Sequence, residues 1–237
     1  MRGMGRWIGA VAAILLLAGV GFLYVSGYLS RDPVTLFAAS GPRSGVAAIY
    51  YSGDSGLRFG MGPATATALA ARGIPVMGVN SATLFRSHRT RAETEAIIAE
   101  TVRDGLHRAG TDRVVLIGQS FGADVLQTGL AALPAALRAR VAGVILVVPG
   151  ADVYFRADPS GLVYHTTPES DGRVTARALD WASLTCIYGT SETDSACPGL
   201  RQPNATLVGM PGGHFLNRDK AGLLRHVLAA IANATRP

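Results

Sequence analysis

The chain has 237 residues, of which 49% are hydrophobic and 16% are charged, a composition that supports a buried core and excludes a disordered chain. Its formal net charge is +6, but the basic residues form no run and are not interleaved with aromatic residues, which argues against nucleic-acid binding. The length allows one large α/β domain or two small ones.

The N-terminal segment differs from the rest of the chain. Residues 7–30 carry no charge and are long enough to cross a membrane as a helix, which needs about 20 residues. Arg2 and Arg6 precede this stretch and predict that its N-terminal end stays in the cytoplasm. A cleaved signal peptide is the alternative, but its apolar region is usually shorter and ends in a small-residue cleavage site. We therefore favour an uncleaved anchor over residues 1–32, followed by an exported domain over residues 33–237.

Short apolar stretches alternate with stretches of helical periodicity along the exported part. The apolar stretches predict strands over residues 46–52, 74–80, 113–118, 140–150, 183–189 and 205–212. The periodic stretches predict helices over residues 64–73, 90–110, 123–133 and 219–234. Nearly continuous apolar strands separated by helices are typical of a parallel sheet that is buried on both faces, so we expect an α/β fold. Residues 151–182 break the alternation, and we expect an inserted loop or cap over the strand ends.

The two cysteines are Cys186 and Cys197, on either side of IYGTSETDSA. Because the domain is predicted to be exported and these are its only cysteines, we expect a disulfide between them. On the chain-entropy model, a loop of this length stabilises the fold by about 3 kcal/mol. Two unpaired thiols are the alternative.

The pattern G-Q-S-F-G lies between a predicted strand and a predicted helix. Alone, it is a weak signal in a chain with 29 glycines. In this context, Gly118 and Gly122 permit the sharp strand-to-helix turn that raises a serine hydroxyl above a sheet. We therefore predict that Ser120 is a nucleophile and that the backbone N–H of Phe121 is one oxyanion donor. A glycine turn that serves packing or phosphate binding is the alternative.

A serine nucleophile needs a base and an orienting acid, which follow it in the chain order acid, then histidine. His214 in MPGGHFLN is the predicted base, because the Pro-Gly-Gly turn can bring its imidazole back over the sheet; His165 is held in reserve. Asp194 is the preferred acid and Glu192 the alternative, both in the loop after a predicted strand. The interpretation of both acids as solvated loop charges stays open.

The second oxyanion donor is predicted in YYSGDSG, where Gly53 and Asp54 offer backbone N–H groups in a loop with little side-chain bulk. An ordinary β-turn also fits that composition. Asp124, four residues after Ser120, is interpreted as an acid that the helix dipole favours in a first turn. We expect the chemistry to need no metal and no cofactor.

The strings GQSFGADVL, YYSGDSG, CIYGTSETDSACP and PGGHF together resemble the VirJ/AcvB family of exported bacterial α/β-hydrolases, over about residues 33–235. The resemblance implies an α/β-hydrolase fold with a mostly parallel central sheet and helices on both faces. It also implies a periplasmic hydrolase of aminoacylated phosphatidylglycerol, with links to virulence and type IV secretion. Carried over by position, it implies Ser120 as nucleophile, Asp194 as acid and His214 as base.

Three positions depart from the family pattern and bear on substrate preference. Ser55 and Leu57 stand where that loop of the family has Gly and Trp, and Phe215 stands where a second histidine is frequent.

The predicted function is that of a periplasmic serine esterase, anchored in the inner membrane, that cleaves lysyl- or alanyl-phosphatidylglycerol. The aminoacyl ammonium requires a negative partner, for which Asp54, Asp152 and Glu192 are candidates. Two alternatives stay open: a carboxylesterase or lipase that acts on another lipid ester, and a secretion-system accessory protein that uses the fold for docking.

Overall fold

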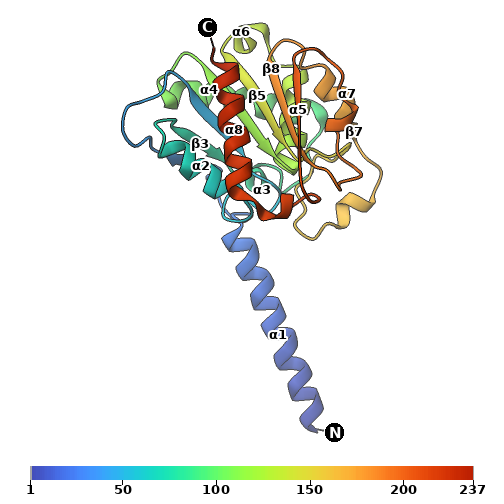
Figure 1. The fold of residues 1–237 in the computed structure, drawn as a ribbon. Coiled ribbons are helices and arrows are strands. Elements are labelled where there is room, and N and C mark those ends of the chain that lie inside the picture. Colours follow the sequence, from blue (N-terminus) through green and yellow to red (C-terminus); the bar gives the residue numbers. More distant parts are fainter. Residues whose placement is uncertain (1, 237) are drawn as a thin grey trace.

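A computed structural model describes residues 2–236, with side chains from Trp7 onward, and shows one long helix projecting from a body built around a sheet (Figure 1). This helix, α1 (Arg2–Val25), contains the apolar stretch Trp7–Val25, which has a mean hydropathy of 2.5 and is not buried by the body. The stretch is long and apolar enough to serve as a membrane anchor or as a signal sequence.

The body contains a seven-stranded sheet in the order β1-β3-β2-β4-β5-β8-β9. The strands are β1 (Val34–Phe37), β2 (Ala47–Tyr51), β3 (Val76–Val79), β4 (Val114–Gln119), β5 (Val141–Val147), β8 (Ser183–Gly189) and β9 (Ala205–Met210). All neighbours pair in parallel except β1, which runs antiparallel to β3 at one edge. The predicted mostly parallel sheet is confirmed.

Helices cover both faces of this sheet (Figure 1). One face packs against α4 (Arg91–Ala109), α5 (Phe121–Ala131) and α7 (Gly172–Arg177). The other packs against α2 (Gly62–Ala70) and α8 (Lys220–Ala234). Two shorter helices, α3 (Ser81–Leu84) and α6 (Ala135–Arg138), complete the set. Side chains alternate between the faces along each strand, so Tyr51 joins the first core and Tyr50 the second, and both are fully buried.

The segment 151–182 has structure of its own. A two-stranded antiparallel ribbon of β6 (Asp152–Val153) and β7 (Ser170–Asp171) frames the 3₁₀-helix η1 (Leu162–His165), and α7 follows. From η1, the Tyr164 hydroxyl donates a hydrogen bond of 2.9 Å to Asp54, which follows β2. The segment therefore contacts the loop at the carboxyl end of that strand.

The C-terminal end of α1 is fixed to the same edge of the sheet. Asn80, directly after β3, donates its amide to the Ser26 carbonyl at 2.9 Å, and the Thr83 hydroxyl donates to the Gly27 carbonyl at 2.7 Å. The ring of Phe22 packs on Phe59 with centroids 5.2 Å apart. Because ligands of parallel sheets bind beyond the carboxyl ends of the strands, α1 leaves the body beside the edge where the site is expected.

Candidate active site

The turn between β4 and α5 has the geometry that the glycines predicted. Ser120 takes φ 52° and ψ −128°, a strained conformation for a residue with a side chain. A Cβ on Gly118 would lie 2.6 Å from the Cα of Ala123, and one on Gly122 would lie 2.2 Å from the Ser52 carbonyl oxygen. Both positions therefore require glycine, and the tight packing holds the serine in its strained conformation.

Ser120 and His214 are brought together as predicted. The Ser120 hydroxyl lies 2.8 Å from Nε2 of His214, which sits in the loop between β9 and α8. His214 Nδ1 lies 2.5 Å from Oε1 of Glu192, in the loop after β8. His165, the reserve base, is an exposed residue of η1. The three side chains thus form one chain of hydrogen bonds, and its acid is a glutamate.

The preference for Asp194 as the partner of His214 is wrong in this structure. The Asp194 side chain is exposed, while its backbone carbonyl accepts a hydrogen bond from the Ala151 N–H. An isolated bridge between Gly150 and Ser195 continues this pairing. Because the backbone at 194–195 is held against residues 150–151, the carboxylate that reaches the imidazole is that of Glu192, two residues earlier.

The predicted disulfide between Cys186 and Cys197 is confirmed, with an S–S distance of 2.06 Å. Cys186 lies inside β8, and Cys197 begins the 3₁₀-helix η2 (Cys197–Gly199). Both cysteines are fully buried. The bridge therefore ties the far end of the loop that carries Glu192 to β8, the strand from which this loop starts.

The electrostatics of the pair suit a base. Burial opposes the charged imidazolium, but the hydrogen bond and the charge of Glu192 outweigh it, so the pKa of His214 is raised above its ordinary value of 6.5. The Glu192 side chain is only 4% exposed, and its Oε2 has no hydrogen-bond partner among the described residues. A buried carboxylate in this position favours the tautomer of His214 that leaves Nε2 free to accept the serine proton.

The two predicted oxyanion donors lie next to Ser120. Phe121 is the first residue of α5, where backbone N–H groups have no partner within the helix. Gly53 lies directly beside the serine, because a Cβ built on it would be 3.6 Å from Cβ of Ser120. The Asp54 carboxylate accepts hydrogen bonds from the Tyr164 and Ser55 hydroxyls. The oxyanion roles of Phe121, Gly53 and Asp54 stay predictions.

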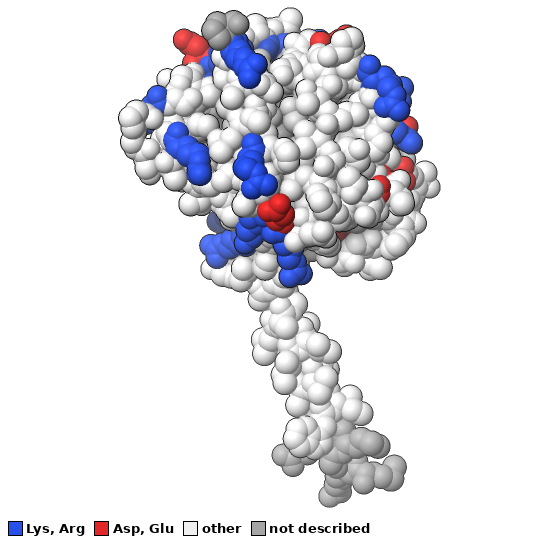
Figure 2. Space-filling view, in the orientation of Figure 1, with Lys and Arg blue, Asp and Glu red and all other residues white. Residues whose placement is uncertain are grey.

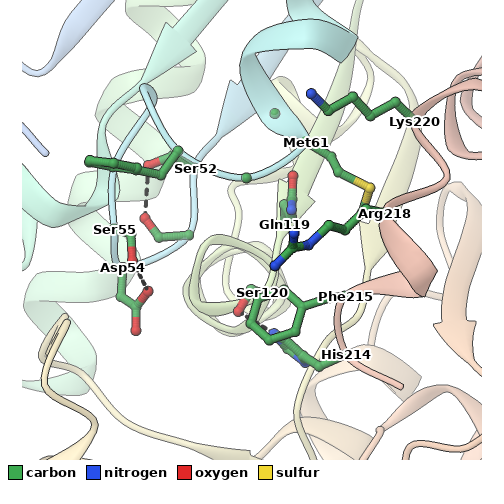
Figure 3. Close-up of a pocket in the computed structure, with 15 residues that line it drawn as sticks. Ser52, Asp54, Ser55, Met61, Gln119, Ser120, His214, Phe215, Arg218 and Lys220 are labelled. Carbon is green, nitrogen blue, oxygen red and sulfur yellow. Dashed lines mark hydrogen bonds between the residues drawn. The ribbon is translucent and has the colours of Figure 1, made fainter. Parts of the chain in front are cut away.

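Two cavities meet at Ser120 and His214. The first has a volume of about 390 Å³ and is drawn in Figure 3. Besides Ser120 and His214, its lining includes Phe59, Met61, Gln119, Arg218 and Lys220. The second has a volume of about 500 Å³. Its wall is rich in carboxylates and tyrosines: Asp54, Asp124, Asp152, Glu192, Asp194, Tyr154 and Tyr164. Asp54 and Phe215 line both cavities.

Asp124 is part of the second cavity, which its interpretation as a helix-dipole residue did not foresee. Its Oδ1 accepts a hydrogen bond of 2.8 Å from the Gly150 N–H. Burial raises the pKa of Asp124 well above its ordinary value, although this hydrogen bond and His214 act in the opposite direction. Tyr164, Arg218 and Lys220 were also missed, since no motif marks them; their nearness to Ser120 arises only from the fold.

Several solved structures share this fold. They include XC6422 from Xanthomonas campestris, described as an α/β serine hydrolase without lid, with 22% identity, a TM-score of 0.58, and coverage of 84% of this chain and 88% of that one. The lipase BlEst2 from Bacillus licheniformis has 12% identity and a TM-score of 0.59, with coverage of 84% and 99%. A serine hydrolase homologue from Coxiella burnetii has 17% identity and a TM-score of 0.57, with coverage of 84% and 90%. The fold is therefore that of the α/β-hydrolases.

No curated protein matched the chain. The model of one protein family, described as bacterial virulence protein (VirJ), matches residues 45–235, which contain every residue of the hydrogen-bonded chain and both cavities' polar walls. The protein is a member of the VirJ family.

Proposed function

We propose that this protein is a membrane-anchored periplasmic serine esterase that hydrolyses the aminoacyl ester of lysyl- or alanyl-phosphatidylglycerol. The observation that carries the proposal is the hydrogen-bonded chain from Ser120 through His214 to Glu192 on a strained strand-to-helix turn. A serine so placed has a base at its hydroxyl and an acid behind that base, which is the arrangement that acyl transfer requires.

The reaction begins when Nε2 of His214 takes the Ser120 proton while the serine oxygen attacks the aminoacyl carbonyl carbon. The negative oxygen of the tetrahedral intermediate faces the N–H groups of Phe121 and of the Gly53–Asp54 loop. The carbon–oxygen bond to the lipid glycerol then breaks, and His214 gives its proton to the departing oxygen, which releases phosphatidylglycerol.

Water completes the cycle. His214 takes a proton from water as the water oxygen attacks the acyl-enzyme, and it returns this proton to Ser120 as the free amino acid leaves. Glu192 keeps the Nδ1 proton of His214 in place and stabilises the imidazolium in both halves of the reaction.

The second cavity suits the aminoacyl group. The substrate carries an ammonium close to its ester, and the cavity wall holds carboxylates next to the nucleophile. Of the three candidate partners, Glu192 is engaged with His214, which leaves Asp54 and Asp152 to receive the ammonium. In this proposal, the segment 151–182 acts as the cap of that cavity, because it supplies Asp152, Tyr154 and Tyr164.

The proposed location follows from α1 and its surroundings. Figure 2 shows Lys and Arg side chains gathered on the body around the place where α1 leaves it. Such a surface is attracted to the anionic lipids of a bilayer. With α1 in the inner membrane and the disulfide-bonded body outside it, the site lies close to the leaflet that holds its substrate.

The test is to incubate the purified full-length protein in detergent with lysyl- and alanyl-phosphatidylglycerol and to measure free amino acid. We expect release by the wild type and a loss of about 10³-fold or more in Ser120→Ala. Unchanged lipids beside rapid cleavage of simple acyl esters would instead identify a carboxylesterase or lipase. If Ser120→Ala maintained the wild-type lipid composition in cells, the docking function would replace the catalytic one.

A further inference from the structure

Two cationic side chains line the first cavity and form no ion pair with a carboxylate among the described residues. Arg218 and Lys220 are exposed residues that point into this cavity from the segment after His214 (Figure 3). Among residues 7–236, whose side chains the structure describes, no carboxylate oxygen lies within 4.0 Å of either cationic group. Asp54 also lines this cavity and accepts hydrogen bonds from the Tyr164 and Ser55 hydroxyls, but its carboxylate forms no ion pair with either cation.

The backbone that presents Arg218 is strained. Leu216, Asn217 and Arg218 have φ values of 47°, 49° and 59°, so three consecutive residues with side chains occupy the left-handed region. Leu216 is fully buried, so its packing in the core accounts for its left-handed conformation. Arg218 has no such packing, and strain of this kind is found where function requires a particular side-chain placement.

The apolar part of the cavity wall leads toward α1. Phe59 and Met61 line it, and the ring of Phe59 packs on Phe22 of α1. Phe215 extends this apolar wall at the cavity mouth and is 74% exposed. The cavity therefore joins an apolar surface beside α1, the two cations and Ser120.

We infer that the first cavity is the leaving-group subsite, in which Arg218 and Lys220 hold the phosphodiester of the lipid while the ester lies at Ser120. The inference rests on the proposed ester hydrolysis. Only one glycerol unit separates the phosphodiester of aminoacyl-phosphatidylglycerol from its scissile ester, so the phosphate must lie close to the nucleophile. A guanidinium is the side chain best matched to phosphate oxygens, and an ammonium adds a second charge.

The experiment compares two soluble substrates with the same acyl group. One is alanyl-glycerophosphoglycerol, which keeps the phosphodiester, and the other is alanyl-glycerol, which lacks it. We expect the wild type to prefer the phosphodiester in kcat/KM, and Arg218→Gln to lower that preference by about 10- to 100-fold, mainly through a loss on the phosphodiester substrate. Lys220→Gln should show a smaller loss of the same kind. Arg225→Gln removes the same charge from an exposed position of α8 outside the cavity and is the matched control.

A second variant separates binding from folding. Arg218→Gly relieves the left-handed strain while it removes the cation, so we expect a higher melting temperature together with a lost phosphodiester preference. Equal losses on both substrates in Arg218→Gln, or a wild type without preference, would overturn the assignment. Inhibition of alanyl-glycerol cleavage by inorganic phosphate but not by glycerophosphoglycerol would identify a free-phosphate site and overturn it as well. A wild type inactive on both substrates would instead reject the proposed function.

Discussion

The two cavities that meet at Ser120 differ in charge and in the parts of the chain that build them. The first holds two cations beside apolar side chains and is built mainly from the loop after β2 and the segment that follows His214. The second is lined by five carboxylates, of which three come from the 151–182 segment and the disulfide-bonded loop and two, Asp54 and Asp124, from the loop after β2 and from α5. A nucleophile between opposite charges is suited to an ester whose acyl part is cationic and whose alcohol part is anionic.

The largest expected effect concerns two carboxylates of the second cavity that are two residues apart. Glu192→Gln should lower kcat by about 10²- to 10⁴-fold, because the amide neither stabilises the imidazolium nor holds the required tautomer. Asp194→Asn, which leaves the hydrogen bond to His214 intact, should change kcat by less than about 2-fold. Steady-state kinetics on one substrate decides between them, and a larger effect at Asp194 would contradict the assignment of Glu192.

The pH dependence of kcat/KM provides a second test of the role of Glu192. The base must be neutral to accept the serine proton, and the pKa of His214 is raised, so kcat/KM of the wild type should increase with pH with a midpoint above 6.5. In Glu192→Gln the partner that raises this pKa is gone, and the midpoint should move to lower pH. A midpoint that does not move would show that another group controls the acid side of the profile.

Loss of the disulfide should affect stability more than chemistry. Cys186→Ala/Cys197→Ala removes a bridge between residues eleven positions apart, which lowers the free energy of unfolding by about 3 kcal/mol on the chain-entropy model. Denaturant titration of wild type and variant measures the difference. An unchanged midpoint would mean that the unfolded chain gains little freedom when the bridge is removed.

Selectivity for a charged acyl group tests the second cavity directly. Asp54→Asn should reduce the preference for alanyl- over N-acetylalanyl-phosphatidylglycerol by about 10-fold, because a desolvated ammonium loses one charged partner. Asp180→Asn removes an exposed carboxylate outside both cavities and is the control. An equal change in the rates of both substrates would assign Asp54 to the geometry of the oxyanion loop instead.

The smallest effect is expected at Asp124. Folding raises the pKa of this carboxyl, so its contribution to stability is fully present below its ordinary value of 3.8 and is lost as pH rises through the raised value. Asp124→Asn keeps an acceptor for Gly150 and should therefore melt a few degrees above the wild type at pH 8, with the difference vanishing toward pH 4. Thermal melts at several pH values provide the measurement, and a variant that is less stable at pH 8 would contradict it.

Most of the sheet could be predicted because its strands are nearly continuous apolar runs; the strand predicted at 183–189 agrees with β8 at both ends. The edge strand β1 was missed, since its four residues are partly exposed and Thr35 interrupts its short apolar stretch. The pairing of Ser120 with His214 was predictable because glycines and chain order mark the two residues. The partner of His214 was not, because Glu192 and Asp194 share one loop and the choice depends on the contact of residue 194 with Ala151, which is distant in sequence.

The junction of α1 with the body contains no flexible linker. Ser26 and Gly27, directly after the helix, are already hydrogen-bonded to the body at Asn80 and Thr83. In the proposed orientation, the enzyme cannot swing on a tether or reach across the periplasm to a second membrane. Its search for substrate is confined to two dimensions, so its turnover in cells depends on how many substrate molecules share its own leaflet and not on their concentration in the cell as a whole.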